Sequence, residues 1–275
     1  MNPIRRPARW AASSILAVLA AGCSGVSTTQ PGTIGVDRTQ YMSGLVSESA
    51  LEQEAGTQYS QMIAQAKAQG ALDRNAAQVQ RVNGISRKLI AQVGAFRPDA
   101  LKWKWETHVI TSKEVNAWCM PGGKIAVYTG LLDQVKPTDA ELAAVIGHEI
   151  SHALREHARE RVSQQMATNL GLSVLAIATG SNAAADLGSQ LTDVMFVLPN
   201  SRTHEAEADR MGVELAARAG YDPRAAITLW QKMAKISSGS APPEFLSTHP
   251  SAASRSADLQ KAAAQVMPLY EKAAK

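Results

Sequence analysis

Residues 148–152 read His148-Glu149-Ile150-Ser151-His152, and the interpretation of the chain starts from this stretch. The helical signals around it begin with Thr138 and Glu141, whose spacing is that of a capping box. Because positions four apart lie on one face of an α-helix, His148 and His152 project together. Two neutral imidazoles in this arrangement can bind one Zn²⁺. Glu149 lies beside them and can take a proton from water at the metal, as the general base of a metalloprotease does.

The pentapeptide alone is also compatible with an exposed helix face that carries these residues by chance. A zinc site needs a third ligand, and a catalytic zinc site needs an open fourth position. A second segment, 201–220, also has the pattern of a helix and offers Glu205 as the third ligand. Asp209 follows one turn later and can hydrogen-bond a ligand histidine, which would fix its tautomer.

Three further stretches occur in a recognisable order with these two helices. They are Asn116-Ala117-Trp118-Cys119-Met120-Pro121-Gly122-Gly123, Leu198-Pro199-Asn200-Ser201-Arg202, and Ser247-Thr248-His249-Pro250 with Arg255 six residues after the histidine. Together with the two helices, they resemble the zinc metalloendopeptidases of the HtpX, Oma and Ste-type CAAX-protease group, most closely its bacterial periplasmic BepA-like and LoiP-like members. The resemblance covers about residues 45–265.

This resemblance implies an α+β, mostly helical, zincin-like fold with an active helix, a glutamate-bearing helix and a small β-sheet. It implies one Zn²⁺ per chain, held by His148, His152 and Glu205, and zinc-dependent endoproteolysis. It also implies that a strand edge beside the active helix holds extended substrate by backbone hydrogen bonds. That strand is either the segment Lys124 to Tyr128 or its partner 116–120.

The role of His249 has two interpretations. The resemblance implies a plug that takes the fourth zinc position, whereas the residues alone favour a cap for a helix over 251–265 or a buried histidine bonded to backbone. His204 and Arg255 are alternative oxyanion contacts, and spacing does not decide between them. A lipoprotein chaperone or assembly factor with a closed, structural zinc site is the alternative function, because four protein ligands would close the site.

Residues 1–22 have the features of a targeting segment. Three arginines precede a short apolar run that is too short to span a bilayer. Ala20-Ala21-Gly22-Cys23 resembles a bacterial lipobox, although Ala20 stands where leucine is more usual; an ordinary cleaved signal is the alternative. We therefore expect lipidation at Cys23, a flexible tether over 23–44 and a protease domain over 45–275.

Removal of residues 1–22 changes the charge argument. The whole chain has 28 basic and 24 acidic residues, and this segment carries three arginines and no acid, so 25 and 24 remain. The near-neutral balance gives no basic patch for nucleic acid. With Cys23 lipidated, Cys119 has no disulfide partner and is expected to be buried. The lipobox-like stretch predicts attachment to the periplasmic face of the bacterial outer membrane, and the family resemblance implies unfolded or misassembled envelope proteins as substrates.

The remaining segments complete the expected organisation. Helices are predicted over 45–69 and 73–93, the second capped by Asp73, and a strand over 102–109. The active helix is predicted over 138–165, with His157 off the ligand face and solvated. We expect a buried helix after residue 166, then a lid over 179–189. A loop over 237–243 and a last helix over 251–265 follow.

Overall fold

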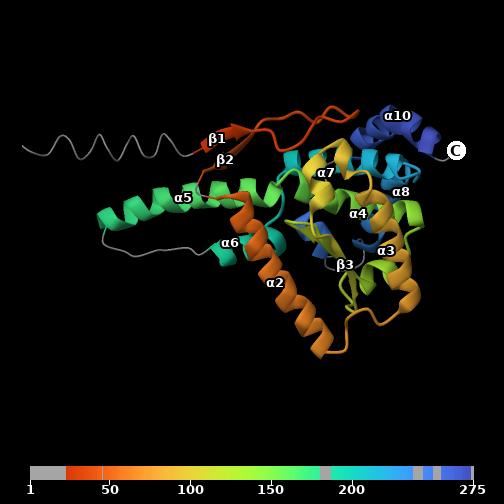
Figure 1. Ribbon diagram of the computed structural model, residues 1–275, viewed down its shortest axis with the longest axis horizontal. Helices are drawn as coiled ribbons and strands as arrows, with labels where there is room; N and C mark the ends of the chain where they lie inside the picture. Colours follow the sequence, from red (N-terminus) through yellow and green to blue (C-terminus); the bar gives the residue numbers. More distant parts are fainter. Residues whose placement is uncertain (1–22, 45, 180–186, 238–243, 250–254, 274–275) are drawn as a thin grey trace, which may run out of the picture.

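The computed structural model describes residues 23–44, 46–179, 187–237, 244–249 and 255–273, without the side chains of Cys23 and 169–179. The elements are, in chain order, β1 (Cys23–Val26), β2 (Gln40–Ser43), α2 (Glu48–Ala68), α3 (Ala76–Ile90), η1 (Val93–Ala95), η2 (Pro98–Lys102), β3 (Glu106–Ile110), β4 (Ala117–Met120), β5 (Lys124–Tyr128), η3 (Leu131–Val135), α4 (Asp139–Leu154), α5 (His157–Thr179), α6 (Leu187–Thr192), η4 (Asp193–Val197), α7 (Arg202–Arg218), α8 (Ala225–Ser237), α9 (Glu244–Thr248) and α10 (Arg255–Ala273). Helix α4 lies in the body of the molecule, packed against α3, α7, α8 and β4, while α2 and α5 extend outward (Figure 1). The predicted α+β, mostly helical class is confirmed.

The larger sheet has the strand order β3-β5-β4. Its central strand β5 runs parallel to β3 and antiparallel to β4, so the hairpin expected over 116–128 is confirmed. Gly122 and Gly123 make the turn with φ of 78° and 82°, a region that side chains disfavour. Strand β3 begins at Glu106, later than predicted, because residues 98–102 form a 3₁₀ turn whose Ala100 carbonyl accepts a hydrogen bond from the Trp105 indole.

Helices α4 and α7 pack closely through two glycines. A Cβ atom on Gly147 would lie 2.9 Å from the Gly212 carbonyl oxygen, and one on Gly212 would lie 2.7 Å from the His148 backbone nitrogen. Real Cβ atoms do not approach backbone atoms so closely, so glycine at both positions lets the helix axes come together. This contact faces the histidines of α4 toward the acids of α7.

The segment 23–44 differs from the flexible tether that its composition predicted. Strands β1 and β2 pair with each other, and Ile34 and Val36 are buried in the main core. The Glu214 carboxylate accepts hydrogen bonds from the backbone nitrogens of Thr33 and Ile34, at 3.1 and 2.8 Å. The segment runs from β1 toward α10, where the side-chain nitrogen of Gln265 donates to the Thr33 carbonyl (Figure 1). The segment has the composition of a linker, but side chains far away in the sequence form hydrogen bonds with its backbone.

The second predicted helix begins three residues later than expected. Asn75, rather than Asp73, caps α3 and accepts from the backbone nitrogens of Ala77 and Gln78. Asp73 has φ of 51° and accepts instead from the backbone nitrogen of Val109. A contact to the sheet therefore takes the carboxylate that local spacing assigned to the cap.

The active helix is shorter than the predicted range of 138–165. Its capping box forms as expected: the Thr138 hydroxyl accepts from the Glu141 backbone nitrogen, and the Thr138 nitrogen donates to the Glu141 carboxylate. The helix ends at Leu154, and Glu156 has φ of 51°, a left-handed conformation that breaks the chain direction. Helix α5 then starts at His157 in a new direction.

The C-terminal part is helical, as expected, but the predicted lid over 179–189 and loop over 237–243 lie largely outside the described residues. The last helix, α10, extends eight residues beyond the predicted end. Within the described part of the chain, no helix combines the length and the apolarity that crossing a membrane requires.

Candidate metal centre

Helices α4, α7 and α9 bring four side chains to one buried point. His148 and His152 come from α4, Glu205 from the first turn of α7, and His249 directly follows α9. One ligand atom from each of them lies within 4.8 Å of those of the others. Ser201 caps α7 by accepting from the His204 backbone nitrogen, which fixes the first turn and so places Glu205.

The distances within this group fit one tetrahedral zinc ion. The Nε2 atoms of His148 and His152 are 3.1 Å apart, and their distances to the nearer oxygen of Glu205 are 3.5 and 3.3 Å. The Nδ1 atom of His249 is 3.2 Å from Nε2 of His148 and 2.9 Å from Oε1 of Glu205. Donors about 2.1 Å from a tetrahedral ion are roughly 3.4 Å from one another. Buried ring nitrogens that face one another require a shared proton or a cation between them, and the donor set fits zinc.

The electrostatics of this point also favour a cation. Burial alone would lower the pKa of His148, but the carboxylates of Glu205 and Asp209 outweigh it and raise the pKa to about 10. Burial opposes the ionised form of Glu205, yet His249 and His148 lower its pKa well below the usual range. The pKa of His152 lies well below its ordinary value, mainly because of burial. A neutral imidazole is the form that binds a metal.

Glu149 lies beside this group and points into the same space. Its Oε1 is 3.5 Å from Nε2 of His249 and has no hydrogen-bond partner among the described residues. Burial raises its pKa, against the opposing charges of His249 and His148. A carboxyl group with a raised pKa can both take up and release a proton.

Asp209 lies where the sequence predicted it, behind a ligand histidine. Its Oδ1 is 3.0 Å from Nδ1 of His148 and also accepts a hydrogen bond of 2.7 Å from Arg255. The carboxylate keeps the proton of His148 on Nδ1 and leaves Nε2 free for a metal.

The two alternative oxyanion contacts are engaged elsewhere. The Arg255 guanidinium is buried, ion-pairs with Glu205 at 3.1 Å and stacks on the Trp230 ring with its central carbon 3.3 Å from the ring centroid. The Nε2 atom of His204 is 3.1 Å from a Glu160 oxygen, away from Glu149. Arg255 therefore holds Glu205 and Asp209, and His204 belongs to the buried polar network that lies behind His157.

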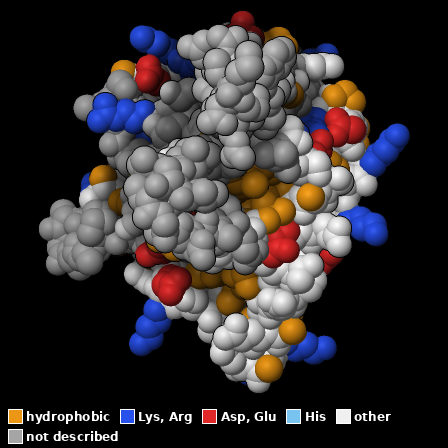
Figure 2. Space-filling model, turned by 90° about the vertical axis from the view of Figure 1, so that its left-hand side faces the viewer, with side chains coloured by type: hydrophobic (Ala, Val, Ile, Leu, Met, Phe, Trp, Pro, Cys, Tyr) orange, Lys and Arg blue, Asp and Glu red, His pale blue; other side chains and the backbone are white. Residues whose placement is uncertain are grey.

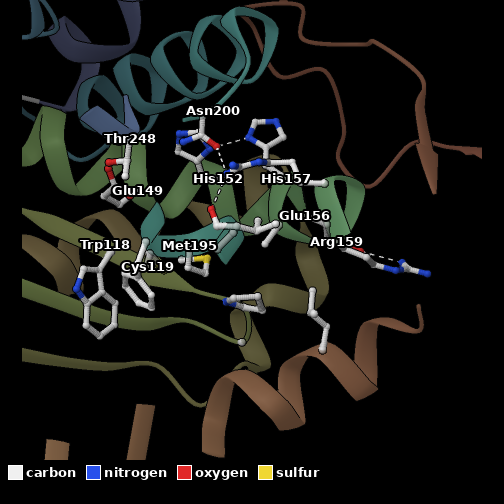
Figure 3. Close-up of a pocket in the computed structure, with 18 of the residues that line it drawn as sticks. Trp118, Cys119, Glu149, His152, Glu156, His157, Arg159, Met195, Asn200 and Thr248 are labelled. Atoms are coloured by element: carbon white, nitrogen blue, oxygen red, sulfur yellow. Dashed lines mark hydrogen bonds and ion pairs between the residues drawn. The ribbon is translucent and has the colours of Figure 1, made fainter. Parts of the chain in front are cut away.

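His157 is buried, although the sequence predicted a solvated side chain. Its Nδ1 atom is 2.8 Å from Nδ1 of His152, and its Nε2 is 3.0 Å from Glu207. Figure 3 shows His152 and His157 next to each other. Burial lowers its pKa to about 3. The prediction failed because it extended α4 through residue 157, whereas the break at Glu156 turns the ring back toward the site.

A cleft runs beside the metal centre. It contains about 730 Å³ of empty space that is open to solvent. Its lining includes Glu149, His152 and His249 from the centre, Trp118 and Cys119 from β4, and Met195 and Phe196 from η4. Figure 3 shows side chains of β4 and of α4 on facing sides of this space. On the face drawn in Figure 2, apolar side chains gather in a hollow bordered by acidic ones.

A comparison with protein-family models decides the class of this site. The model for Peptidase family M48 matches residues 75–263, more than half of the chain and all four side chains of the centre. The chain belongs to Peptidase family M48. The membership confirms the expected metallopeptidase class and zincin-like fold, and it agrees with a site for one zinc ion. The narrower likeness to HtpX-type, CAAX-type and LoiP-like members stays a prediction.

Individual relatives of this M48 chain come from mitochondria and from bacteria. It is 43% identical to the mitochondrial metalloendopeptidase OMA1 of Arabidopsis thaliana over 58% of this chain and 31% of that protein. It is 36% identical to human OMA1 over 63% of this chain and 35% of that protein. The beta-barrel assembly-enhancing protease of Escherichia coli is 30% identical over 69% of this chain and 40% of that protein. The matches thus span about a third to two fifths of these relatives.

The sheet topology distinguishes between the two strands considered for substrate binding in this M48 chain. Strand β5 is paired on both sides, whereas β4 pairs with β5 alone within the described sheet and packs against α4. An extended peptide can add to a strand only at an edge with free backbone groups. Of the two candidates, the edge strand is therefore Ala117–Met120, and its first three residues also line the cleft.

Cys119 is buried, as expected. Burial raises the pKa of its thiol well above the ordinary value, with a smaller contribution from Glu149. The neutral thiol packs as a small apolar group.

Proposed function

We propose that this M48 chain is a zinc-dependent endopeptidase. The observation that carries the proposal is the convergence of His148, His152 and Glu205, with Glu149 beside them, on a cleft bordered by the edge strand β4. Fold alone would not support a reaction, but these groups have the types and positions that peptide hydrolysis requires.

Each group has a defined task in this proposal. His148, His152 and Glu205 would hold a zinc ion, and such an ion would polarise the scissile carbonyl and lower the pKa of water to about 7. Strand β4 aligns the peptide by backbone hydrogen bonds. Glu149 accepts a proton from the attacking water and then donates it to the nitrogen of the leaving amine. The buried position of Glu149 raises its pKa and so favours the return of the proton.

The test is hydrolysis of an unfolded protein such as casein by the full chain, with chelator and after zinc is restored. We expect chelator to stop the reaction and zinc to restore it. Glu149→Gln should keep one zinc ion per chain and lose about 100-fold or more of the turnover. Turnover that resists chelator, or normal turnover by zinc-loaded Glu149→Gln, would refute the proposal.

His249 regulates access in this proposal. With Nδ1 toward the other donors and Nε2 toward Glu149, it takes the position that an open site would leave to water. His249→Ala should therefore fold normally, release zinc more easily and raise basal proteolysis. Early melting without a gain of activity would make His249 structural, and loss of activity in a folded variant would place it among the catalytic groups.

The same four donors favour the second candidate function, a chaperone or assembly factor with a structural zinc site. This function predicts that chelator unfolds the protein and that both wild type and His249→Ala fail to cleave casein. Proteolysis by His249→Ala would exclude it.

We further propose a BepA-like or LoiP-like role in the bacterial envelope, with a lipid anchor at Cys23 in the outer membrane and misassembled envelope proteins as substrates. The lipobox-like stretch and the similarity to the Escherichia coli protease support this location, while the OMA1 relatives are mitochondrial. Cys23→Ser should move the protein to the soluble periplasmic fraction or leave an uncleaved precursor. Wild type found wholly in the soluble periplasm would disprove the anchor.

A further inference from the structure

A pair of histidine rings links the metal centre to a buried carboxylate. His152 and His157 meet through their Nδ1 atoms at 2.8 Å, and Nε2 of His157 lies 3.0 Å from Oε2 of Glu207. In a continuous helix, residue 157 would lie about 140° around the axis from residue 152, because each residue turns about 100°. The left-handed Glu156 removes that separation.

The protons of this chain of groups have one consistent arrangement. If Nε2 of His152 faces the metal, the proton of its neutral ring is on Nδ1. Nδ1 of His157 must then accept that proton's hydrogen bond, so His157 carries its own proton on Nε2. That proton is donated to Glu207, whose carboxylate can only accept.

We propose that His157 is a positioning residue for the metal centre, which fixes the tautomer and ring orientation of His152 and connects it to Glu207. The inference rests on the proposed zinc site. It adds an imidazole between a ligand histidine and its supporting carboxylate, where His148 contacts its carboxylate directly.

Further contacts around Glu207 hold His157 and Glu207 in place. The Arg38 guanidinium donates to Glu207 at 2.7 Å and makes two hydrogen bonds of 2.8 Å to Glu160. Arg155, fully buried, also donates to Glu207. The His204 ring stacks on His157 with centroids 4.3 Å apart and a 15° angle between planes. His157 is therefore fixed in position and in rotation.

Three variants in the full chain separate positioning from packing. His157→Phe keeps a ring and removes the acceptor. His157→Asn keeps an acceptor, because its Oδ1 occupies a place like that of the histidine Nδ1. Val82→Ala creates a cavity at a fully buried side chain of α3, away from the site, and serves as the control for lowered stability.

The measurements are zinc affinity and release rate with a chromogenic chelator, melting temperature of the metal-free protein, and ¹⁵N–¹H spectra of the histidine rings. We expect His157→Phe to lose about 10-fold to 100-fold in zinc affinity and His157→Asn to recover most of it. Val82→Ala should lower the melting temperature and leave zinc affinity unchanged. Zinc-loaded wild type should show His157 with its proton on Nε2.

Wild-type zinc affinity in His157→Phe, an equal loss in Val82→Ala, or a proton on Nδ1 of His157 would each overturn the proposal. These outcomes are independent of peptide hydrolysis. If zinc affinity depends on His157 but the wild type cleaves no protein, the proposed function is refuted and the positioning role is left intact. If the wild type cleaves protein but zinc affinity does not change when His157 is replaced, the positioning role is refuted and the proposed function stands.

Discussion

The two histidines of the pentapeptide stand one turn apart on α4, yet they are supported in different ways. His148 contacts the Asp209 carboxylate directly, and Arg255 holds that carboxylate from α10. His152 contacts a neutral imidazole, with Glu207 and Arg38 behind it. The first support comes from the C-terminal half of the chain, and the second ends in the N-terminal segment. The support of the two ligand histidines therefore depends on contacts that α10 and the N-terminal segment make with the acids of α5 and α7.

The difference also has an electrostatic consequence. A carboxylate next to a ligand ring raises the pKa of His148 to about 10, while His152 remains far below its ordinary value because burial dominates. In the absence of metal, His148 is the one of these two ligand rings that carries a second proton and is positively charged. Zinc must displace that proton to bind, so zinc affinity should rise with pH.

The largest effect on zinc affinity should come from a change at Glu205, whose carboxylate lies next to both ligand histidines. Glu205→Gln replaces a charged donor within 3.5 Å of both ligand histidines by a weaker amide. We expect zinc affinity to fall by more than about 100-fold, the upper range for residues that only support ligands. Metal analysis after dialysis measures this loss.

Glu214→Gln is the matched control, because Glu214 is buried on the same helix and bonds the N-terminal segment instead. It should lower stability and retain zinc. A Glu205→Gln variant that keeps its zinc as tightly as wild type would show that the third ligand is assigned wrongly.

The comparison between the supports is tested by Asp209→Asn and Glu207→Gln. Asp209→Asn removes a charge in direct contact with a ligand ring, and we expect a loss of about 10-fold to 100-fold in zinc affinity. Glu207→Gln should cost less, because an imidazole separates it from His152. Isothermal titration of the two variants with zinc gives both values. A larger loss in Glu207→Gln would reverse the order of the two supports.

The smallest effect concerns Glu160, which belongs to the outer part of the His152 support. Although burial raises its pKa, Arg38, His204 and Gln40 lower it overall to well below its usual range. A lowered folded pKa means that the unfolded chain binds more protons in acid. This contribution to stability is complete above about pH 4.3, the unfolded value, and is lost as pH falls below it.

Glu160→Gln should therefore lower the free energy of unfolding at pH 7 and flatten its decline between about pH 4.3 and pH 3. Urea unfolding at several pH values measures this. If the free energy of unfolding falls equally steeply in acid for wild type and Glu160→Gln, the charge of Glu160 does not stabilise the fold.

Local sequence determined several parts of the centre. The capping box at Thr138 and Glu141 and the cap at Ser201 place the starts of α4 and α7. Helical periodicity then puts His148 and His152 on one face and Asp209 one turn after Glu205. These features follow from hydrogen bonds and turn geometry within a few residues, so they can be read without the rest of the fold.

Packing decided the rest, because those contacts join segments far apart in sequence. Local sequence predicted that Asp73 caps a helix, that the active helix continues past Glu156 and that 23–44 is a linker. In the folded chain, Asp73 bonds to the sheet, Glu156 ends the helix direction and Ile34 and Val36 of the segment 23–44 are buried in the core. Sheet order left β4 as the edge beside α4. The sequence by itself determined which groups α4 and α7 present; tertiary structure decided what they meet, because burial and polar pairing are satisfied over the whole molecule.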